Sequence, residues 1–179
     1  VAEMRSAMDV AEQALDSAQI DRAGKILRQV EDAIPCLHEI VAKKDLHRFA
    51  RDMAMVSFFE QNEVDAVNWA VTAKATGVRV TWPKAFPPGH GFGTMYEDLE
   101  MPMEGRADGK QLKRPDRGGV FLDDDFLAEP VALAEAPHLV QVFDAKGAWV
   151  NAFWQDGAAF ASKIAEDGTD VPKPPKWWS

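Results

Sequence analysis

The stretch Asp45–Ala75, DLHRFARDMAMVSFFEQNEVDAVNWAVTAKA, decides the fold of this chain. Over Leu46–Phe59 it places apolar residues at the i, i+3, i+4 and i+7 spacings of a helix with one buried face. The polar run Glu60–Glu63 interrupts that pattern, and Val64–Ala75 resumes it. Gly77 follows as a helix stop, because glycine adopts the left-handed conformation without a Cβ clash. The stretch therefore predicts two antiparallel helices joined by a short polar turn.

The residues before this stretch repeat its pattern at an offset of 43 residues. Small residues align with small ones, and a polar turn falls at the same place in both copies. Helices of this length are marginal alone, so two such hairpins are expected to stack and bury a shared apolar face. The aligned pairs are Ala7/Ala50, Val10/Met53, Ala11/Ala54, Ala14/Ser57, Leu15/Phe58, Gln19/Asn62, Ala23/Ala66, Leu27/Ala70 and Val30/Ala73.

This alternation of small and bulky residues around a polar turn resembles tetratricopeptide repeats, over about 75 residues. The Gly, Tyr and Pro positions of that motif are absent, and the 43-residue offset exceeds the family's usual period of about 34. We expect the second helix of the first hairpin over Asp21–Ile34, ended by Pro35, and a short extra helix up to Lys44 that accounts for the longer offset. The resemblance implies a groove that binds a partner segment.

After Gly77 the composition changes. Val78–Gly93 holds three prolines and three glycines and cannot continue a helix, while its aromatic residues indicate that it packs against something. His90 between two glycines is typical of a turn or of a hydrogen bond to the backbone. Met95–Leu99 is expected to form one helical turn that caps the repeat, with Tyr96 and Leu99 facing inward.

From Met101 the pattern favours strands. Gly118–Leu122 is predicted to be a short strand that the acidic run Asp123–Asp125 ends. His138–Asp144 is a plausible central strand, and a turn over Ala145–Gly147 leads to an antiparallel partner over Ala148–Gln155. A lone hairpin is barely stable, so further strands are expected near residues 104–112 and 129–134.

The sequence thus predicts an α+β fold, in which an N-terminal antiparallel helix-hairpin repeat precedes a small antiparallel β sheet or sandwich. We expect four regions: a helical-hairpin repeat domain over residues 1–77, a Pro/Gly linker and capping turn over 78–100, a small β domain over 101–163, and a Pro/Trp tail over 164–179.

The segment Pro102–Gly109, PMEGRADG, followed by short strands and a hairpin, resembles the small β modules called PEGA domains. The resemblance rests on Glu104, Gly105 and the Asp108-Gly109 turn over about 60 residues, although Met103 and Arg106 interrupt the defining tetrapeptide. Such modules often follow helical repeats in bacterial envelope proteins. The resemblance implies a periplasmic or cell-envelope protein with a scaffolding or carbohydrate-contacting module.

Composition and charge narrow the function classes. A chain of 179 residues with 46% hydrophobic and 27% charged residues is ordinary for a globular protein of one domain or two small ones. The net charge of −9 disfavours a nucleic-acid partner, and no apolar run is long enough to span a membrane. The lone Cys36 cannot form an internal disulfide. Because the chain opens on Val1, we expect a removed N-terminal segment; a secretory signal or a lipid anchor is compatible with that.

The sequence contains no convincing reaction centre and implies no cofactor or bound metal. We therefore expect a non-catalytic interaction or scaffold component of a bacterial envelope assembly, with another protein as its partner. Interfaces combine aromatic anchors with charges. On that basis the candidate partner-binding residues are Arg48, Arg51, Asp52, Met55, Phe59, Trp69, Trp82, Trp177 and Trp178.

The alternative is a metal-dependent enzyme or accessory protein. It would use His90, His138 and the Asp123–Asp125 cluster, which the fold would have to bring together. Three consecutive acids lack the spaced ligands of a calcium loop, so a solvated acidic turn is the simpler interpretation of that run. Elemental analysis of the purified protein distinguishes the two hypotheses.

Overall fold

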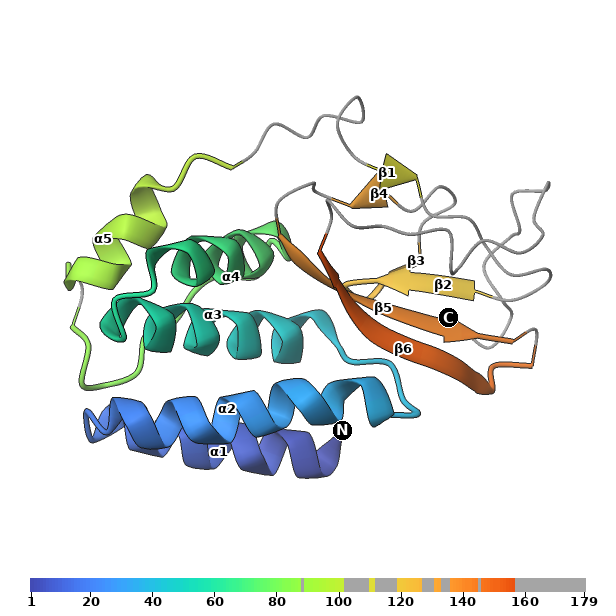
Figure 1. Ribbon diagram of the computed structural model, residues 1–179, viewed down its shortest axis with the longest axis horizontal. Helices are drawn as coiled ribbons and strands as arrows, with labels where there is room; N and C mark the ends of the chain where they lie inside the picture. The colour runs from blue at the N-terminus through green and yellow to red at the C-terminus, as the bar shows by residue number, and fades with distance from the viewer. Residues whose placement is uncertain are drawn as a thin grey trace. The chain divides into compact units, whose positions relative to one another are not determined.

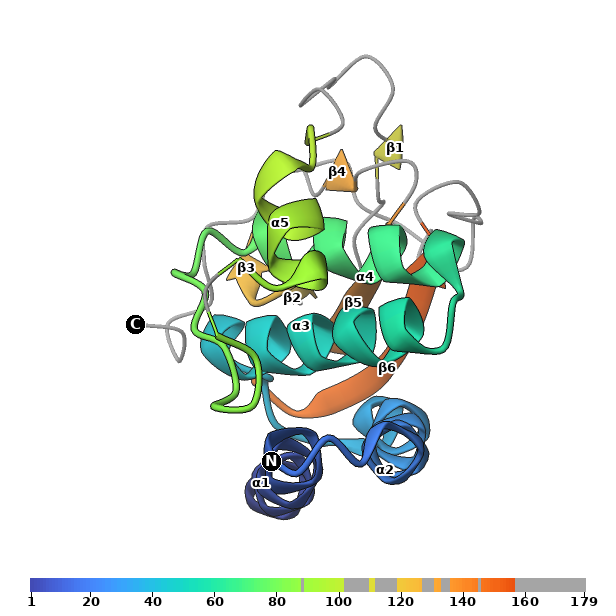
Figure 2. The ribbon, with the colours of Figure 1, turned by 90° about the vertical axis from the view of Figure 1, so that its left-hand side faces the viewer.

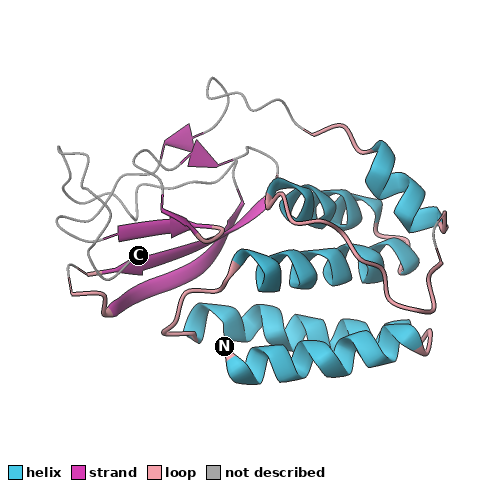
Figure 3. Ribbon diagram, turned by 180° about the vertical axis from the view of Figure 1, so that it is seen from behind, coloured by secondary structure: helices cyan, strands magenta, loops and turns pink. Residues whose placement is uncertain are grey.

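The computed structural model describes residues 1–87, 89–101, 110–111, 119–126, 131–132, 136–144 and 146–156. Helices come first along the chain and strands follow, so the predicted α+β class is confirmed (Figures 1 and 3). The chain divides into two compact units. A helical unit comprises residues 1–34 and 43–101, and a β unit comprises residues 35–42 together with the described residues after 101.

Two helical hairpins form most of the helical unit. The first consists of α1 (Ala2–Asp16) and α2 (Ile20–Ala33), the second of α3 (Lys43–Phe59) and α4 (Glu63–Ala75). Figure 2, which looks nearly along α1 and α2, shows these two helices side by side. Helix α3 packs against α4 as well as against α1 and α2, so it lies between α4 and the first hairpin.

The two hairpins turn in the same way, 43 residues apart. Ala18 and Gln61 both adopt the left-handed conformation, with φ of 53° and 64°. Gln19 N–H donates to the Ala14 carbonyl at 2.8 Å, and Asn62 N–H donates to the Ser57 carbonyl at 2.8 Å. These are the bonds of a Schellman motif, which satisfies the last carbonyl groups of α1 and of α3. The predicted repeat is thus present as two copies of one backbone turn.

Two of the aligned alanine pairs, Ala11/Ala54 and Ala23/Ala66, are buried in both copies, as expected for a shared apolar face, whereas Ala7 of the pair Ala7/Ala50 is only half-buried. Ala11, Ala54, Ala23 and Ala66 are all at most 1% exposed. Helix α3 is buried on all sides over most of its length, because every residue from Asp45 to Ser57 except Arg48 is buried. Its polar residues are therefore enclosed with its apolar ones, which single-face periodicity does not predict.

Helix α5 (Gly91–Asp98) closes the helical unit and starts earlier than the predicted turn at Met95. His90 caps it, since His90 Nδ1 accepts the N–H of Gly93 at 3.1 Å, and this confirms the expected hydrogen bond to the backbone. Tyr96 is buried as predicted, whereas Leu99 lies after the helix in extended conformation and is half-buried. Lys74 of α4 donates to three carbonyl groups at the end of α5, at 3.1, 3.2 and 2.7 Å.

The prediction of a short extra helix before Lys44 is wrong. A single 3-10 turn spans Ile34–Cys36, residues 37–42 contain no helix, and α3 already starts at Lys43. The side chain of Gln141 explains why these residues stay extended. It accepts the Val41 N–H at 2.9 Å and donates to the Glu39 carbonyl at 2.8 Å, so the segment satisfies its backbone groups within the β unit.

The described strands of the β unit form one four-stranded antiparallel sheet in the order β3-β2-β5-β6 and a separate pair, β1-β4. The predicted hairpin is present: β5 and β6 pair along their length, and Gly147 takes a φ of 83° in the turn between them. The bounds are β1 Lys110–Gln111, β2 Gly119–Leu122, β3 Asp125–Phe126, β4 Val131–Ala132, β5 Pro137–Phe143 and β6 Trp149–Asp156.

The central strand β5 is buried on both faces from His138 to Phe143. Phe121 of β2 packs edge-on against Phe143 with ring centroids 5.6 Å apart. The amide of Gln141, buried in this core, is satisfied by its two backbone bonds, which is what a buried polar group requires. Among the described residues, no helix is long and apolar enough to cross a membrane.

Candidate binding groove

Charged side chains of α1 and α3 face one another within the helical unit. Asp9, Glu12 and Asp16 lie on one face of α1, because spacings of three and four residues bring side chains to the same side of a helix. The same spacing brings Arg48 and Arg51 together on α3. The two rows have opposite signs and are in contact.

Glu12 lies at the centre of this contact and accepts hydrogen bonds from both arginines. Arg48 bonds one of its carboxylate oxygens, and Arg51 Nη2 lies 3.1 Å from the other. Arg48 also donates to Asp9 at 2.7 Å. Arg51 pairs with Asp52 at 2.6 Å. The network therefore links the first helices of the two hairpins.

Burial changes along this network. The side chains of Arg51 and Asp52 are 2% and 0% exposed, whereas those of Arg48 and Asp9 are 23% and 60% exposed. Burial raises the pKa of Asp52 to about 6, and the neighbouring Arg51 charge only partly opposes this effect. The inner end of the network is thus structural, and the outer end can exchange its partners with solvent or a ligand.

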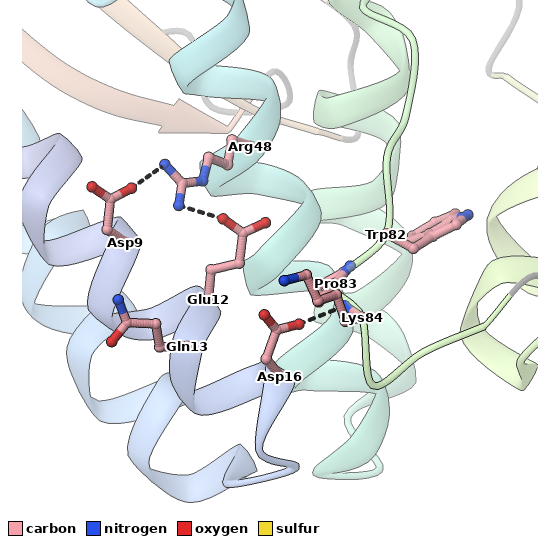
Figure 4. A pocket seen from close by; sticks show the side chains of 8 residues that line it. All are labelled: Asp9, Glu12, Gln13, Asp16, Arg48, Trp82, Pro83 and Lys84. Carbon is pink, nitrogen blue, oxygen red and sulfur yellow. Dashed lines mark hydrogen bonds and ion pairs between the residues drawn. The ribbon is translucent and has the colours of Figure 1, made fainter.

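A groove of about 410 Å³ opens at this outer end (Figure 4). One side is α1, and the other is formed by Arg48 and by the segment after α4, where the Lys84 N–H donates to an Asp16 carboxylate oxygen. The lining is mostly polar, with three carboxylates, an amide and two cationic side chains. The lining residues are Asp9, Glu12, Gln13, Asp16, Arg48, Trp82, Pro83 and Lys84.

An aromatic cluster anchors the segment that forms this second wall. The indole of Trp82 points away from α1 in Figure 4 and makes edge contacts with three rings. Its ring centroid lies 4.9 Å from that of His90, 5.6 Å from Phe92 and 5.5 Å from Tyr96. Burial raises the pKa of Tyr96 to about 12 and lowers that of His90, so both rings stay neutral near pH 7.

The structure brings two of the candidate partner-binding residues, Arg48 and Trp82, to one groove. Phe59 is 38% exposed and contacts Phe58 and Phe86 instead. Asp52, Met55 and Trp69 are at most 6% exposed and have no surface for a partner, which corrects their assignment to a groove. Arg51 is buried as well and does not line the groove, but its guanidinium donates to Thr81 of the segment that forms the second wall. Trp177 and Trp178 lie outside the described residues, as do the PEGA-like segment 102–109 and the tail 164–179.

Sequence reasoning missed the α1 side of the groove. Asp9, Glu12 and Asp16 carry a usable signal, since acids at spacings of three and four follow one face of an amphipathic helix. Gln13 and Lys84 carry none, because nothing local distinguishes them from other surface residues. Lys84 reaches the groove only because its segment folds back onto α1.

The residues of the alternative metal or enzyme site have other roles. His90 uses Nδ1 to cap α5. In the β unit, His138 Nδ1 lies 2.6 Å from Asp123 Oδ2, and the other Asp123 oxygen accepts the Leu139 N–H at 2.8 Å. Asp123 and Asp124 both have positive φ, 51° and 72°, and form the two-residue turn between β2 and β3. The His138–Asp123 pair thus holds a strained turn against β5.

No group of three or more His, Cys, Asp or Glu side chains able to hold a metal ion occurs among the residues that the structure describes. Comparison with known proteins gives no match: no family model fits the sequence, and no curated protein or solved structure is significantly similar to it.

Proposed function

We propose that this chain is a non-catalytic protein-interaction module, and that the groove between α1 and the Trp82–Lys84 segment binds an extended segment of a partner protein. The tetratricopeptide-like character of the two hairpins is part of this proposal. It is supported by the two identical Schellman turns and by the stacking of α3 between α4 and the first hairpin.

The chemistry of the groove favours a peptide over a small cofactor. Small-molecule pockets are mostly apolar and enclose their ligand, with a few fixed polar groups. This groove has an open rim of carboxylate, amide and cationic groups, and only Trp82 and Pro83 are apolar. Such side chains can accept from the N–H groups and donate to the C=O groups of an extended peptide. Hydrogen bonds to the main chain recur in peptide recognition.

One observation carries the proposal: side chains of the two hairpins already bind main-chain groups of the segment that forms the second wall of the groove. Arg51 donates to the Thr81 carbonyl, and Asp16 accepts the Lys84 N–H. Both bonds join a side chain of the hairpins to a main-chain group. The surface therefore has the donors and acceptors that peptide binding needs.

Site-specific photo-crosslinking in native cells tests the proposal. Gln13 and Gln29 are both exposed glutamines, on α1 at the groove and on α2 respectively. A photoreactive residue at Gln13 is expected to give one defined adduct with a partner, and Asp16→Asn is expected to weaken it at least tenfold. The same label at Gln29 is the matched control. Equal adducts from both positions, or none from Gln13, would refute the proposal.

A further inference from the structure

The segment Thr81–Lys84, with the sequence TWPK, forms one wall of the groove through its last three residues and enters a turn at Lys84. Its Thr81 carbonyl and hydroxyl both accept from Arg51 Nη1, the hydroxyl at 3.3 Å. Two residues on, Pro83 is buried and lines the groove, and the Lys84 N–H donates to Asp16. In between, Trp82 inserts its ring against those of His90, Phe92 and Tyr96.

This attachment is local and small. Residues 78–83 belong to no helix or strand, and Arg79, Thr81, Lys84 and Ala85 are exposed. The hydrogen bonds that join Thr81–Lys84 to the hairpins all use side chains of Arg51 and Asp16. A segment outside helices and strands, held by a few side chains, opens at lower free energy than the helices on which it rests.

We propose that Thr81–Lys84, which forms one wall of the groove, is an intramolecular ligand of the face of α1 and α3 behind it, and that a partner segment of the same chemistry displaces it from that face: a stretch with an aromatic residue, then proline, then a basic residue. This inference rests on the proposed function and names its partner class. The structure offers a counterpart for these features: the aromatic ring fits the His90, Phe92 and Tyr96 rings, and the proline needs no N–H partner.

The basic residue and the backbone complete the match. Asp9, Glu12 and Asp16 place three carboxylates along the groove, and Asp16 accepts the N–H of Lys84. Opening of the segment frees the Arg51 guanidinium and the Asp16 carboxylate for the backbone of the incoming peptide. Because the internal segment is tethered, its effective concentration is on the order of millimolar, and it weakens an external peptide accordingly.

Hydrogen exchange tests whether the segment opens by itself. The amide of Lys84 is expected to exchange at least 100-fold faster than that of buried Ala54 in α3. Asp16→Asn is expected to raise the exchange rate of the Lys84 amide and to leave that of the Ala54 amide unchanged. Exchange of Lys84 at the rate of Ala54 would overturn the inference, because the segment would then leave only on global unfolding.

A disulfide lock tests displacement. Asp16→Cys and Lys84→Cys in a Cys36→Ser background tie the segment down when oxidised and release it when reduced, so the reduced form is the matched control. The probe is a fluorescent peptide of residues 78–87, VRVTWPKAFP. Both forms lack the Asp16 carboxylate and share the loss of affinity that this causes, so only their difference is diagnostic. We expect the reduced form to bind the peptide at least tenfold more tightly than the oxidised form, and a peptide with alanine for the tryptophan to lose binding.

The outcomes separate the two proposals. Equal binding to the oxidised and reduced forms would overturn the internal-ligand inference and leave the groove intact. The same holds if neither the reduced form nor the chain with Asp16 and Lys84 intact binds the peptide while the Gln13 label captures a partner. If the Gln13 label captures nothing, the proposed function itself fails, and the internal ligand fails with it.

Discussion

Gly24 marks the closest approach of α2 to α3, and its replacement tests how the hairpins are packed. A Cβ at this position would lie 2.8 Å from Val56 Cγ1, 2.9 Å from an Arg28 guanidinium nitrogen and 3.0 Å from a Glu60 carboxylate oxygen. The last two atoms end flexible side chains and can move. Val56 cannot move aside, because it is 1% exposed and its β-branched side chain has one favoured rotamer in a helix.

Two effects of Gly24→Ala therefore oppose each other. Alanine in place of glycine stabilises a helix interior by about 1 kcal/mol. Overpacking against a rigid neighbour costs about 1–3 kcal/mol. We expect the free energy of unfolding to fall by about 1 kcal/mol on balance. With Val56→Ala the contact disappears, and Gly24→Ala is then expected to stabilise the chain by up to about 1 kcal/mol.

Urea unfolding followed by circular dichroism at 222 nm measures all four members of this double-mutant cycle. The cycle subtracts the cost of Val56→Ala itself, so the sign reversal is the diagnostic result. Gly91→Ala is the matched control, because its Cβ would meet Phe58 only at 3.5 Å, an ordinary contact. If Gly24→Ala stabilises the chain equally with and without Val56, α2 and α3 are not packed as described.

Four further predictions follow from the same contacts. Burial raises the pKa of Asp52 from 3.8 to about 6 in the folded chain. The protonated carboxyl therefore stabilises the folded chain by about 3 kcal/mol below about pH 4, and this stabilisation is lost as the pH rises through 6. Asp52→Asn should remove this fall from a pH series of urea titrations. Lys74→Met deletes three hydrogen bonds at the end of α5; it should lower stability by about 1–2 kcal/mol and speed amide exchange in α5 more than in α1. Ala18→Gly and Gln61→Gly relieve left-handed residues at equivalent turns, so thermal melts should show gains of similar size, about 0.5–1 kcal/mol each. Finally, elemental analysis of dialysed protein should give well below one zinc or calcium ion per chain, and a stoichiometric ion would revive the metal-site hypothesis.

The sequence predicts the hairpins well because local signals agree with one another. Apolar spacing predicts α3 and α4 to within three residues at their starts, and both end where expected. The 43-residue offset identifies Gln19 and Asn62 as equivalent, and both follow a left-handed residue at the same kind of helix end. The β5-β6 hairpin is equally local, since strand alternation and the Gly147 turn occur within one short stretch.

Local signals fail where a residue's partner is distant in the chain. The extra helix predicted before Lys44 does not form, because the Gln141 side chain, a hundred residues away, bonds the backbone there. Arg51 and Asp52 look like surface charges of an amphipathic helix. They are enclosed because α3 is covered on more than one side, which a single-helix pattern cannot express.

Some residues of the candidate groove can be predicted from the sequence, and others are placed there only by the tertiary structure. Arg48 and Trp82 could be chosen from residue type alone, since charges and large aromatic rings favour interfaces. Their meeting at one groove, with α1 opposite, depends on a chain that leaves α4 and returns to Asp16. The sequence by itself determined the helix hairpins, their repeat and the main β hairpin, because backbone preferences and apolar periodicity act within a few residues. Only the tertiary structure decided which charges are buried and which form a binding surface, because burial depends on every element that packs around a side chain.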